Sequence, residues 1–161
     1  MRLDGKVAIV TASTRGIGLA CTQRLAREGA TVYMAARNME RAENRAKELN
    51  DEGCNVKTVY NDATEKETYT SMVEEVFKNE GRIDILVNNF GTSNPQKDLD
   101  IKNTEYDEYI RTVDINLASV FMTSQAAIPH MAANGGGSII NISSIGGLRP
   151  DISQIAYGTS K

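Results

Sequence analysis

Short runs of apolar residues alternate along the chain with longer segments in which apolar residues recur at helical spacing. The runs have the length of β-strands and lie at residues 6–11, 31–35, 56–60, 83–87 and 138–142. The intervening segments predict helices that end near Gly29, Gly53 and Gly81, and a longer helix over about 105–131 whose end Pro129 marks or kinks. Regular alternation of strand and helix predicts an α/β fold with one doubly wound parallel sheet, a single domain over all 161 residues.

The first strand is followed by a glycine-containing turn that leads directly into the first helix. The turn reads Thr-Ala-Ser-Thr-Arg-Gly-Ile-Gly at residues 11–18, a spacing that differs from G-x-G-x-x-G. Unpaired N–H groups and the positive dipole end of a helix favour a phosphate, so we predict that the turn binds the pyrophosphate of a dinucleotide. The alternative is an ordinary turn whose glycines only permit tight packing. The candidate cofactor-binding residues here are Thr11, Ser13, Thr14, Arg15, Gly16, Ile17 and Gly18.

The end of the second strand lacks the acidic residue that would bind the 2′-hydroxyl of an NAD ribose. It carries Arg37 instead, so that Arg37 and Arg15 flank the expected position of the ribose. Each arginine alone is more typical of a solvated surface. A pair of guanidinium groups, however, suits a 2′-phosphate, and the pair therefore predicts NADP(H). Asn38 follows Arg37 and joins this candidate set.

Asp62 and Ala63 follow the third strand and extend the candidate cofactor set. Asp62 could accept a hydrogen bond from an adenine amino group, or it could be an acid at the start of the next helix, and both alternatives stay open. Thr64 and Glu67 form a capping-box pattern that predicts where this helix begins. The set is completed after the fourth strand, at the sheet edge where ligands bind, by Asn89, Phe90 and Gly91.

The last segment of the chain carries the candidate reactive side chains. Tyr157 and Lys161 are four residues apart and so share one helix face, where an ammonium stabilises a phenolate and favours general acid–base chemistry. A lone Y-x-x-x-K is common and gains weight only from its place after a fifth strand. Ser143 or Ser144 could polarise a carbonyl, and neither has a base arranged for nucleophilic attack. Asn116 is unusual within a helix, although chance also explains one such asparagine.

The composition argues against nucleic acids and membranes as partners and so favours a small-molecule substrate. Acidic residues outnumber basic ones by 21 to 18, and the basic residues are scattered, which argues against nucleic-acid binding. The apolar runs are too short to span a membrane, and the N-terminus lacks a signal-peptide pattern. Cys21 and Cys54 fit neither a metal site nor a disulfide framework, which predicts a reduced, cytoplasmic compartment. The single histidine, His130, argues against a metal site.

Taken together, these motifs resemble the short-chain dehydrogenase/reductase family over the whole chain. Residues 11–18 match its T-G-x-x-x-G-x-G turn, 88–91 its N-N-A-G, and 157–161 its Y-x-x-x-K. Two positions depart from the pattern: Ala12 replaces the first glycine of the turn, and Phe90 replaces the alanine of N-N-A-G. We expect Ala12 to restrict the backbone, and Phe90 to place a ring near the adenine and ribose side of the cleft.

The resemblance implies hydride transfer between a nicotinamide and a substrate oxygen centre, with Tyr157 exchanging the proton. Ser144 matches the family's catalytic serine because it precedes Tyr157 by thirteen residues, and it implies a hydrogen bond to the substrate oxygen. Ser144 and Tyr157 are thus the implied substrate-binding residues. The resemblance also implies that Lys161 binds the nicotinamide ribose and that Asn116 holds a water that completes a proton relay.

A narrower similarity, to 7α-hydroxysteroid dehydrogenases of clostridial type, is carried by residues 88–94, 127–131, 135–139 and 150–157. It implies an NADP-dependent oxidoreductase that acts on the 7α-hydroxyl of a bile acid or steroid. A 3-oxoacyl carrier-protein reductase, or another small-ketone reductase, is the competing interpretation within the family. A nucleotide-binding fragment without catalysis is the alternative from another class.

Members of this family continue well beyond the Y-x-x-x-K motif, through further strands and a loop that covers the substrate. We therefore expect the 161 residues to be the N-terminal part of a longer enzyme. In the family, the long helix and the helix that begins at Tyr157 form the usual faces between subunits. This implies a homo-oligomer, a dimer or a tetramer, in the full-length form.

Overall fold

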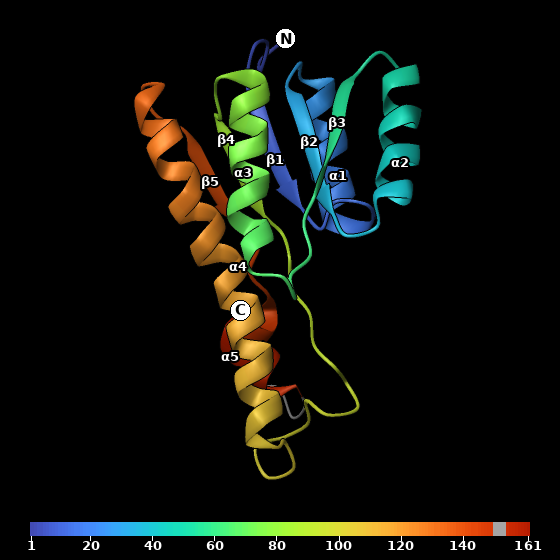
Figure 1. Ribbon diagram of the computed structural model, residues 1–161. Coiled ribbons are helices and arrows are strands. Elements are labelled where there is room, and N and C mark those ends of the chain that lie inside the picture. Colours follow the sequence, from blue (N-terminus) through green and yellow to red (C-terminus); the bar gives the residue numbers. More distant parts are fainter. Residues whose placement is uncertain (150–153) are drawn as a thin grey trace.

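The computed structural model describes residues 1–149 and 154–161, so the 150–157 segment lies partly outside the described residues. Those residues form one parallel sheet with helices on both faces, which confirms the predicted doubly wound, Rossmann-like fold (Figure 1). In chain order the elements are β1 (Val7–Thr11), α1 (Gly16–Arg27), β2 (Thr31–Ala36), α2 (Met39–Asp51), β3 (Asn55–Tyr60), α3 (Glu67–Glu80), β4 (Ile85–Asn88), α4 (Tyr106–Ala133), β5 (Ser138–Asn141), the 3₁₀ helix η1 (Ile145–Gly147) and α5 (Ile155–Ser160).

All strand pairs of the sheet are parallel, and the strand order is β3-β2-β1-β4-β5. From β1 the chain moves outward through β2 to β3 and then returns to the other side of β1 as β4. In sheets of this kind a ligand crevice opens at the carboxyl ends of the strands, where the direction of winding reverses. Here that position lies just beyond Thr11 and Asn88, the last residues of β1 and β4.

Alternate residues of the strands supply two hydrophobic cores, one on each face of the sheet. Val7 and Ile9 of β1 contribute to the core shared with α3 and α4. Ala8 and Val10 contribute to the core shared with α1 and α2. Because β1 is buried on both faces, its sequence is a continuous apolar run. The edge strand β5 is largely exposed, and its Ile140 is 43% exposed.

A buried carboxylate fixes the amino-terminal edge of the sheet, at the far end from the crevice. Asp84 accepts hydrogen bonds from the Val7 N–H (2.9 Å) and from Lys6 Nζ (3.0 Å). Arg82 donates to the same carboxylate through Nε (2.8 Å) and Nη2 (2.6 Å). Burial favours the neutral acid, but these donors, Arg82 foremost, hold the pKa of Asp84 well below its usual range. The ionised carboxylate therefore joins the start of β4 to β1.

Two local predictions about helix ends need correction. Helix α3 begins at Glu67 with Lys66 at its N-cap, so the predicted capping box with Thr64 does not form. Thr64 donates its N–H (2.9 Å) and hydroxyl (2.8 Å) to Asp62 Oδ1 instead, which closes a separate loop before the helix. Pro129 lies inside α4 rather than at its end, and the helix continues for another turn beyond it.

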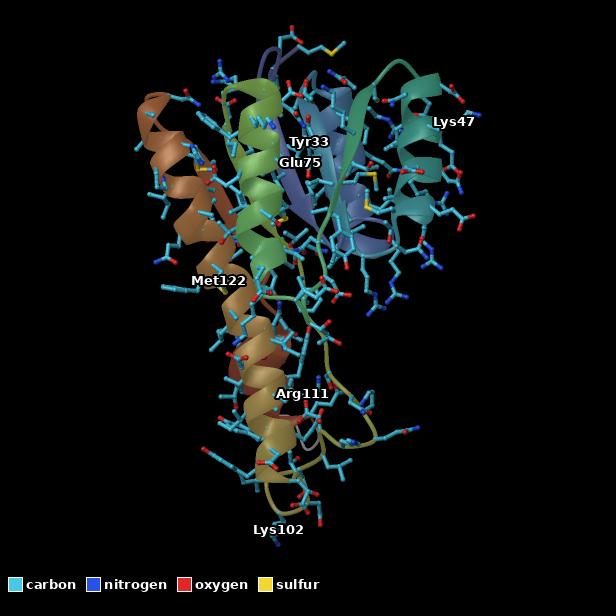
Figure 2. The ribbon with its side chains drawn as sticks, in the orientation of Figure 1. Tyr33, Lys47, Glu75, Lys102, Arg111 and Met122 are labelled. Atoms are coloured by element: carbon cyan, nitrogen blue, oxygen red, sulfur yellow. The ribbon has the colours of Figure 1, made fainter. Side chains whose placement is uncertain are left out.

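Helix α4 extends beyond the sheet. Its C-terminal half lies beside α3, whereas its N-terminal half projects past the carboxyl ends of the strands, where α5 packs against it (Figure 1). Figure 2 shows Arg111 on the projecting half and Met122 closer to the sheet. The projecting half forms one wall of the site described below. Among the described residues, no helix is long and apolar enough to cross a membrane.

Candidate functional site

The turn between β1 and α1 brings the backbone close to the crevice. Ala12 has a φ of +51° and Gly16 a φ of +55°, both in the left-handed region that favours glycine. Gly18 has no room for a side chain, because an added Cβ would lie 2.6 Å from the Ala12 carbonyl oxygen and 2.6 Å from Asn89 Nδ2. Arg15 at the N-cap makes no side-chain cap to α1. A turn of this kind before a helix N-terminus is compatible with phosphate binding, which stays a prediction.

Thr11 ties this turn to the end of β4. Its buried hydroxyl accepts the backbone N–H groups of Asn89 (3.0 Å) and Phe90 (3.1 Å). In return, Asn89 Nδ2 donates to the carbonyl oxygens of Thr11 (3.1 Å) and Ala12 (3.2 Å). The Ser13 hydroxyl is also buried and donates to the backbone of β2 (3.4 Å). Thr11, Ser13 and Asn89, all predicted cofactor-binding residues, therefore hold the turn in shape from beneath the cleft.

A cleft of about 480 Å³ opens over the turn. Arg15 and Arg37 both line it, so the structure brings together the two cations that the sequence placed at one ribose. Arg37 is 74% exposed, and its Nε lies 3.8 Å from Asp62 Oδ2. Arg41 of α2 lines the same cleft and was not predicted, because the sequence marks it only as one more arginine after β2. The other predicted residues on the lining are Thr14, Asn38, Asp62, Ala63, Phe90 and Gly91.

Two further predicted residues, Asp62 and Ile17, need separate description. Asp62 is not the acid at the helix start, because α3 begins only at Glu67 and the Asp62 carboxylate bonds to Thr64 in its own loop. Its other predicted partner, the adenine amino group, stays a prediction. Ile17 has a side chain that is 60% exposed on the first turn of α1. Gly16 and Gly18 contribute to the cleft through backbone shape.

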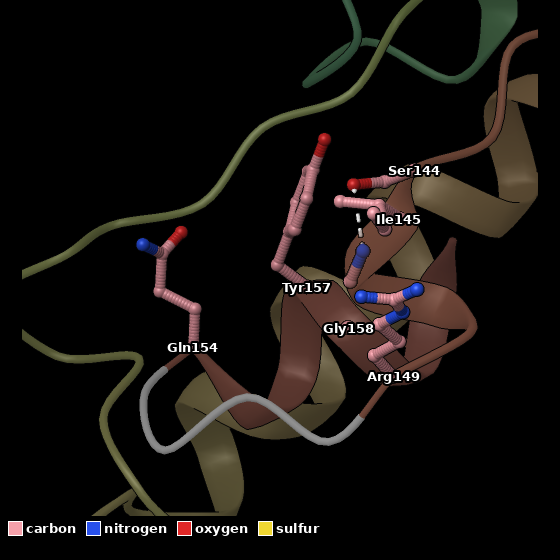
Figure 3. A pocket seen from close by; sticks show the side chains of 7 residues that line it. Ser144, Ile145, Arg149, Gln154, Tyr157 and Gly158 are labelled. Atoms are coloured by element: carbon pink, nitrogen blue, oxygen red, sulfur yellow. Dashed lines mark hydrogen bonds between the residues drawn. The ribbon is translucent and has the colours of Figure 1, made fainter.

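A smaller pocket of about 320 Å³ lies beside α5 and forms the second half of the site. Ser144 and Tyr157 both line it, and Figure 3 shows the Ser144 hydroxyl pointing toward the Tyr157 side chain. Ser144 Oγ accepts the N–H of Gly146 (3.2 Å), an arrangement in which its own proton can point to a ligand. Arg149 and Gln154 line the pocket as well, and neither was predicted. A ligand oxygen in this pocket would meet two hydroxyl donors.

Lys161 follows Tyr157 by one helical turn but reaches toward the end of β4. Its Nζ donates to the Phe90 carbonyl oxygen at 3.2 Å. Burial lowers the pKa of the Lys161 ammonium. The approach is close, since a Cβ added to Gly91 would lie 2.9 Å from Nζ. Helix α5 therefore directs Tyr157 to the pocket, and Lys161, the residue just after the helix, extends toward the cleft that Phe90 and Gly91 line.

Asn116 is buried where α4, α5 and the loop after β4 meet. Its Nδ2 donates to the Thr92 carbonyl oxygen (2.9 Å) and to Ser160 Oγ (2.8 Å). Its Oδ1 accepts the Thr92 N–H at 2.9 Å. Thr92 and Ser160 were not predicted, because nothing in their spacing marks them as partners of Asn116. The amide therefore fixes the position of the helix that carries Tyr157 and Lys161.

Comparison with curated proteins gives relatives of known name. Over 160 residues the chain is 54% identical to the 7α-hydroxysteroid dehydrogenase of Clostridium sardiniense, covering 99% of this chain and 61% of that protein. It is 49% identical to the 7α-hydroxysteroid dehydrogenase of Paraclostridium sordellii, with 99% and 60% covered. A 3-oxoacyl-[acyl-carrier-protein] reductase of Thermotoga maritima is 35% identical, with 100% and 64% covered. The chain thus spans about three fifths of the length of these relatives.

Solved structures of similar fold include two complexes with NADP. A gluconate 5-dehydrogenase from Burkholderia cenocepacia J2315, in complex with NADP and tartrate, has a TM-score of 0.90 and 35% identity, covering 99% of this chain and 62% of that one. A metagenomic short-chain oxidoreductase in complex with NADP has a TM-score of 0.91 and 31% identity, with 100% and 72% covered. Residues 6–161 match the family described as short chain dehydrogenase. The chain therefore belongs to the short chain dehydrogenase family.

Proposed function

We propose that the whole protein is an NADP-dependent oxidoreductase that interconverts a secondary alcohol and a ketone. One observation carries this proposal: Tyr157 of α5 lies in a pocket with Ser144, and Lys161, directly after α5, reaches the edge of the cleft. Acid–base chemistry at the substrate oxygen is thereby adjacent to the cofactor. We further place this activity in the cytoplasm, because Cys21 and Cys54 carry free thiols.

The residues around the cleft fit a dinucleotide that carries a 2′-phosphate. The amino end of α1 suits the pyrophosphate. Arg15 and Arg37 suit the 2′-phosphate, since each guanidinium can donate two parallel hydrogen bonds to it. Gly18 lets α1 pack closely against the Ala12 carbonyl oxygen, and Gly91 lets Lys161 Nζ approach the end of β4, because a Cβ at either position would collide with these atoms. The two solved relatives in complex with NADP support the same choice of cofactor.

When bound, the cofactor would supply or accept the hydride, and the chain's own residues transfer the proton. During reduction, Tyr157 donates its phenolic proton to the carbonyl oxygen, and during oxidation it takes the proton from the hydroxyl. Ser144 donates a hydrogen bond to that oxygen as negative charge develops on it. The Lys161 ammonium stabilises the phenolate and binds the adjoining ribose. Asn116, next to Thr92 and Ser160, holds the water through which the proton returns to solvent.

We infer that the substrate is a steroid or bile acid with a 7α-hydroxyl. Support comes from identities of 54% and 49% to two dehydrogenases of that name. Identity falls to 35% for the 3-oxoacyl reductase, which is the competing candidate within the family. The competing candidate of another class, a nucleotide-binding module, would bind the cofactor through the same cleft without transferring hydride.

Turnover assays on the whole protein separate these candidates. We expect NADPH formation from NADP⁺ with a 7α-hydroxy bile acid and none with its 7β epimer. Oxidation of NADPH by an acetoacetyl thioester, without turnover of the bile acid, would support the acyl reductase instead. NADPH binding without turnover of either compound would support the binding module. The control is Tyr157→Phe, which should bind NADPH normally and lose about 10²- to 10⁴-fold in kcat.

We also propose that copies of the protein associate through α4, as a dimer or as part of a tetramer. One face of α4 exposes large apolar side chains, among them Ile110, Leu117, Phe121 and Ile128. Phe121 is 64% exposed. A contiguous row of this kind on a long helix is typical of a surface that another helix covers. Two identical faces would meet about a twofold axis.

A further inference from the structure

The helix that carries Tyr157 does not cap its own amino end. Gln154 is the N-cap of α5, with a φ of +60° and a ψ of +50°, and within the described part of the chain its side chain makes no cap. This left-handed conformation costs an ordinary residue about 1–2 kcal/mol. The first N–H of the helix, that of Ile155, donates to the carbonyl oxygen of Leu99 at 3.0 Å. The loop between β4 and α4 therefore begins the cap that Gln154 does not provide.

Asp98, in the same loop, binds the next two N–H groups of the helix. Its Oδ1 accepts the N–H of Ala156 at 2.8 Å, and its Oδ2 accepts the N–H of Tyr157 at 2.9 Å. The Asp98 side chain is completely buried. Both oxygens of one carboxylate thus bind successive N–H groups at the positive end of a helix, where a negative charge is stabilised. One of those N–H groups belongs to the proposed acid–base residue itself.

Asp98 is held by its own loop, and a cation on α4 interacts with it electrostatically. The Asp98 N–H donates to the Asn94 carbonyl oxygen at 2.7 Å, which makes the loop turn back on itself. Arg111 of α4 (Figure 2) is hydrogen-bonded to Glu108, which raises the Arg111 pKa, and the charge on Asp98 adds to that increase. A cation therefore lies within electrostatic range of the buried carboxylate, which lowers the cost of burying it.

We propose that Asp98 is a positioning residue that sets the place of Tyr157 in the active site. The proposal rests on the proposed function, in which Tyr157 exchanges the proton. A carboxylate that holds two successive N–H groups fixes both the rotation and the height of the first turn of α5. Tyr157 lies in that turn, so loss of the carboxylate moves the phenol relative to Ser144. Displacements of about 1 Å in a catalytic group lower rates by about 10²-fold.

The test compares Asp98→Asn with the matched control Asp100→Asn in the whole protein. Asparagine at 98 keeps one acceptor but turns an N–H₂ group toward the second backbone N–H. Asp100 is an acid in the same loop whose carboxylate bonds only to Lys102 and Asn103 among the described residues. We expect Asp98→Asn to lower kcat by about ten- to a hundredfold, with the KM and the NADPH Kd changed by less than about threefold. Asp100→Asn should leave all three near the wild-type values.

Hydrogen exchange provides a readout that does not depend on turnover. In Asp98→Asn the amides of Ala156 and Tyr157 should exchange at least about tenfold faster, while those of the sheet stay protected. Unchanged kcat with unchanged exchange would overturn the proposal, and so would equal losses in kcat, NADPH affinity and global stability. If Asp98→Asn does not fold, Asp98→Ser, whose hydroxyl can accept one N–H, takes its place. If the wild-type protein turns over no substrate, the proposed function fails, and exchange at Tyr157 still decides whether Asp98 anchors it.

Discussion

Replacing Thr11 by valine should destabilise the protein, although it changes the size and shape of the side chain very little. The Thr11 hydroxyl accepts the N–H groups of Asn89 and Phe90, and Thr11 is only 2% exposed. Valine leaves both N–H groups, which are partly buried, without their acceptor. A fully buried donor that is left without its partner costs about 1–3 kcal/mol, so for two partly buried donors the free energy of unfolding should fall by about 2–4 kcal/mol. Thr11→Ser keeps the hydroxyl and removes one methyl group, which costs about 1 kcal/mol.

Urea unfolding of the whole protein measures these differences, provided that the slopes with denaturant are equal. Thr22→Val is the matched control, because Thr22 is also fully buried and its hydroxyl donates to the Gly18 carbonyl oxygen at 3.0 Å. That hydroxyl accepts no N–H among the described residues, so we expect the free energy of unfolding to fall by less than about 1.5 kcal/mol. A Thr11→Val protein as stable as Thr11→Ser would refute the reasoning, because the lost hydroxyl would then cost no more stability than the lost methyl group.

Three further predictions concern cofactor choice, acid stability and assembly. Arg15→Ala with Arg37→Ala should weaken NADPH binding by about 1–3 kcal/mol for each charge-assisted hydrogen bond to the 2′-phosphate that is removed, and leave NADH binding nearly unchanged. Calorimetric titration measures both affinities. The control is Arg45→Ala, which removes a cation that pairs with Glu48 on α2. Equal weakening of NADPH and NADH binding by the double substitution would contradict the assignment. Because the folded pKa of Asp84 is lowered, its stabilising effect is present above about pH 4 and is lost as the pH falls further. The difference in the free energy of unfolding between the wild type and Asp84→Asn should therefore be largest near neutral pH and should shrink steadily below about pH 4. Unfolding curves at several pH values measure this difference, and a difference independent of pH would contradict the prediction. Phe121→Glu should lower the mass measured by light scattering from oligomer toward monomer, and an unchanged mass would place the interface elsewhere.

The strands and helices of this fold could be predicted because their patterns report burial directly. The continuous apolar run of β1 reflects a strand covered on both faces. Helix starts were less predictable, because a local pattern does not show which hydrogen bonds the folded chain chooses. Thr64 has the sequence of a cap, yet its N–H and hydroxyl bond to Asp62, and α3 begins later, at Glu67. In such cases the local loop and the helix N-terminus compete for the same side-chain and backbone hydrogen-bonding groups.

The same contrast holds for the candidate site. A sequence motif identifies its reactive residues, whereas the residues that position them can be identified only from the folded chain. Tyr157 and Lys161 are recognisable because their spacing carries meaning on a helix. Asp98 is not, since its partners in α5 lie 58 and 59 residues further along the chain. Ala12 illustrates both sides: the sequence marked it as a weak point, and the structure shows it in a left-handed conformation nonetheless. Asn89 Nδ2 donates to the Ala12 carbonyl oxygen and so helps to hold that costly conformation in place from a distant part of the chain.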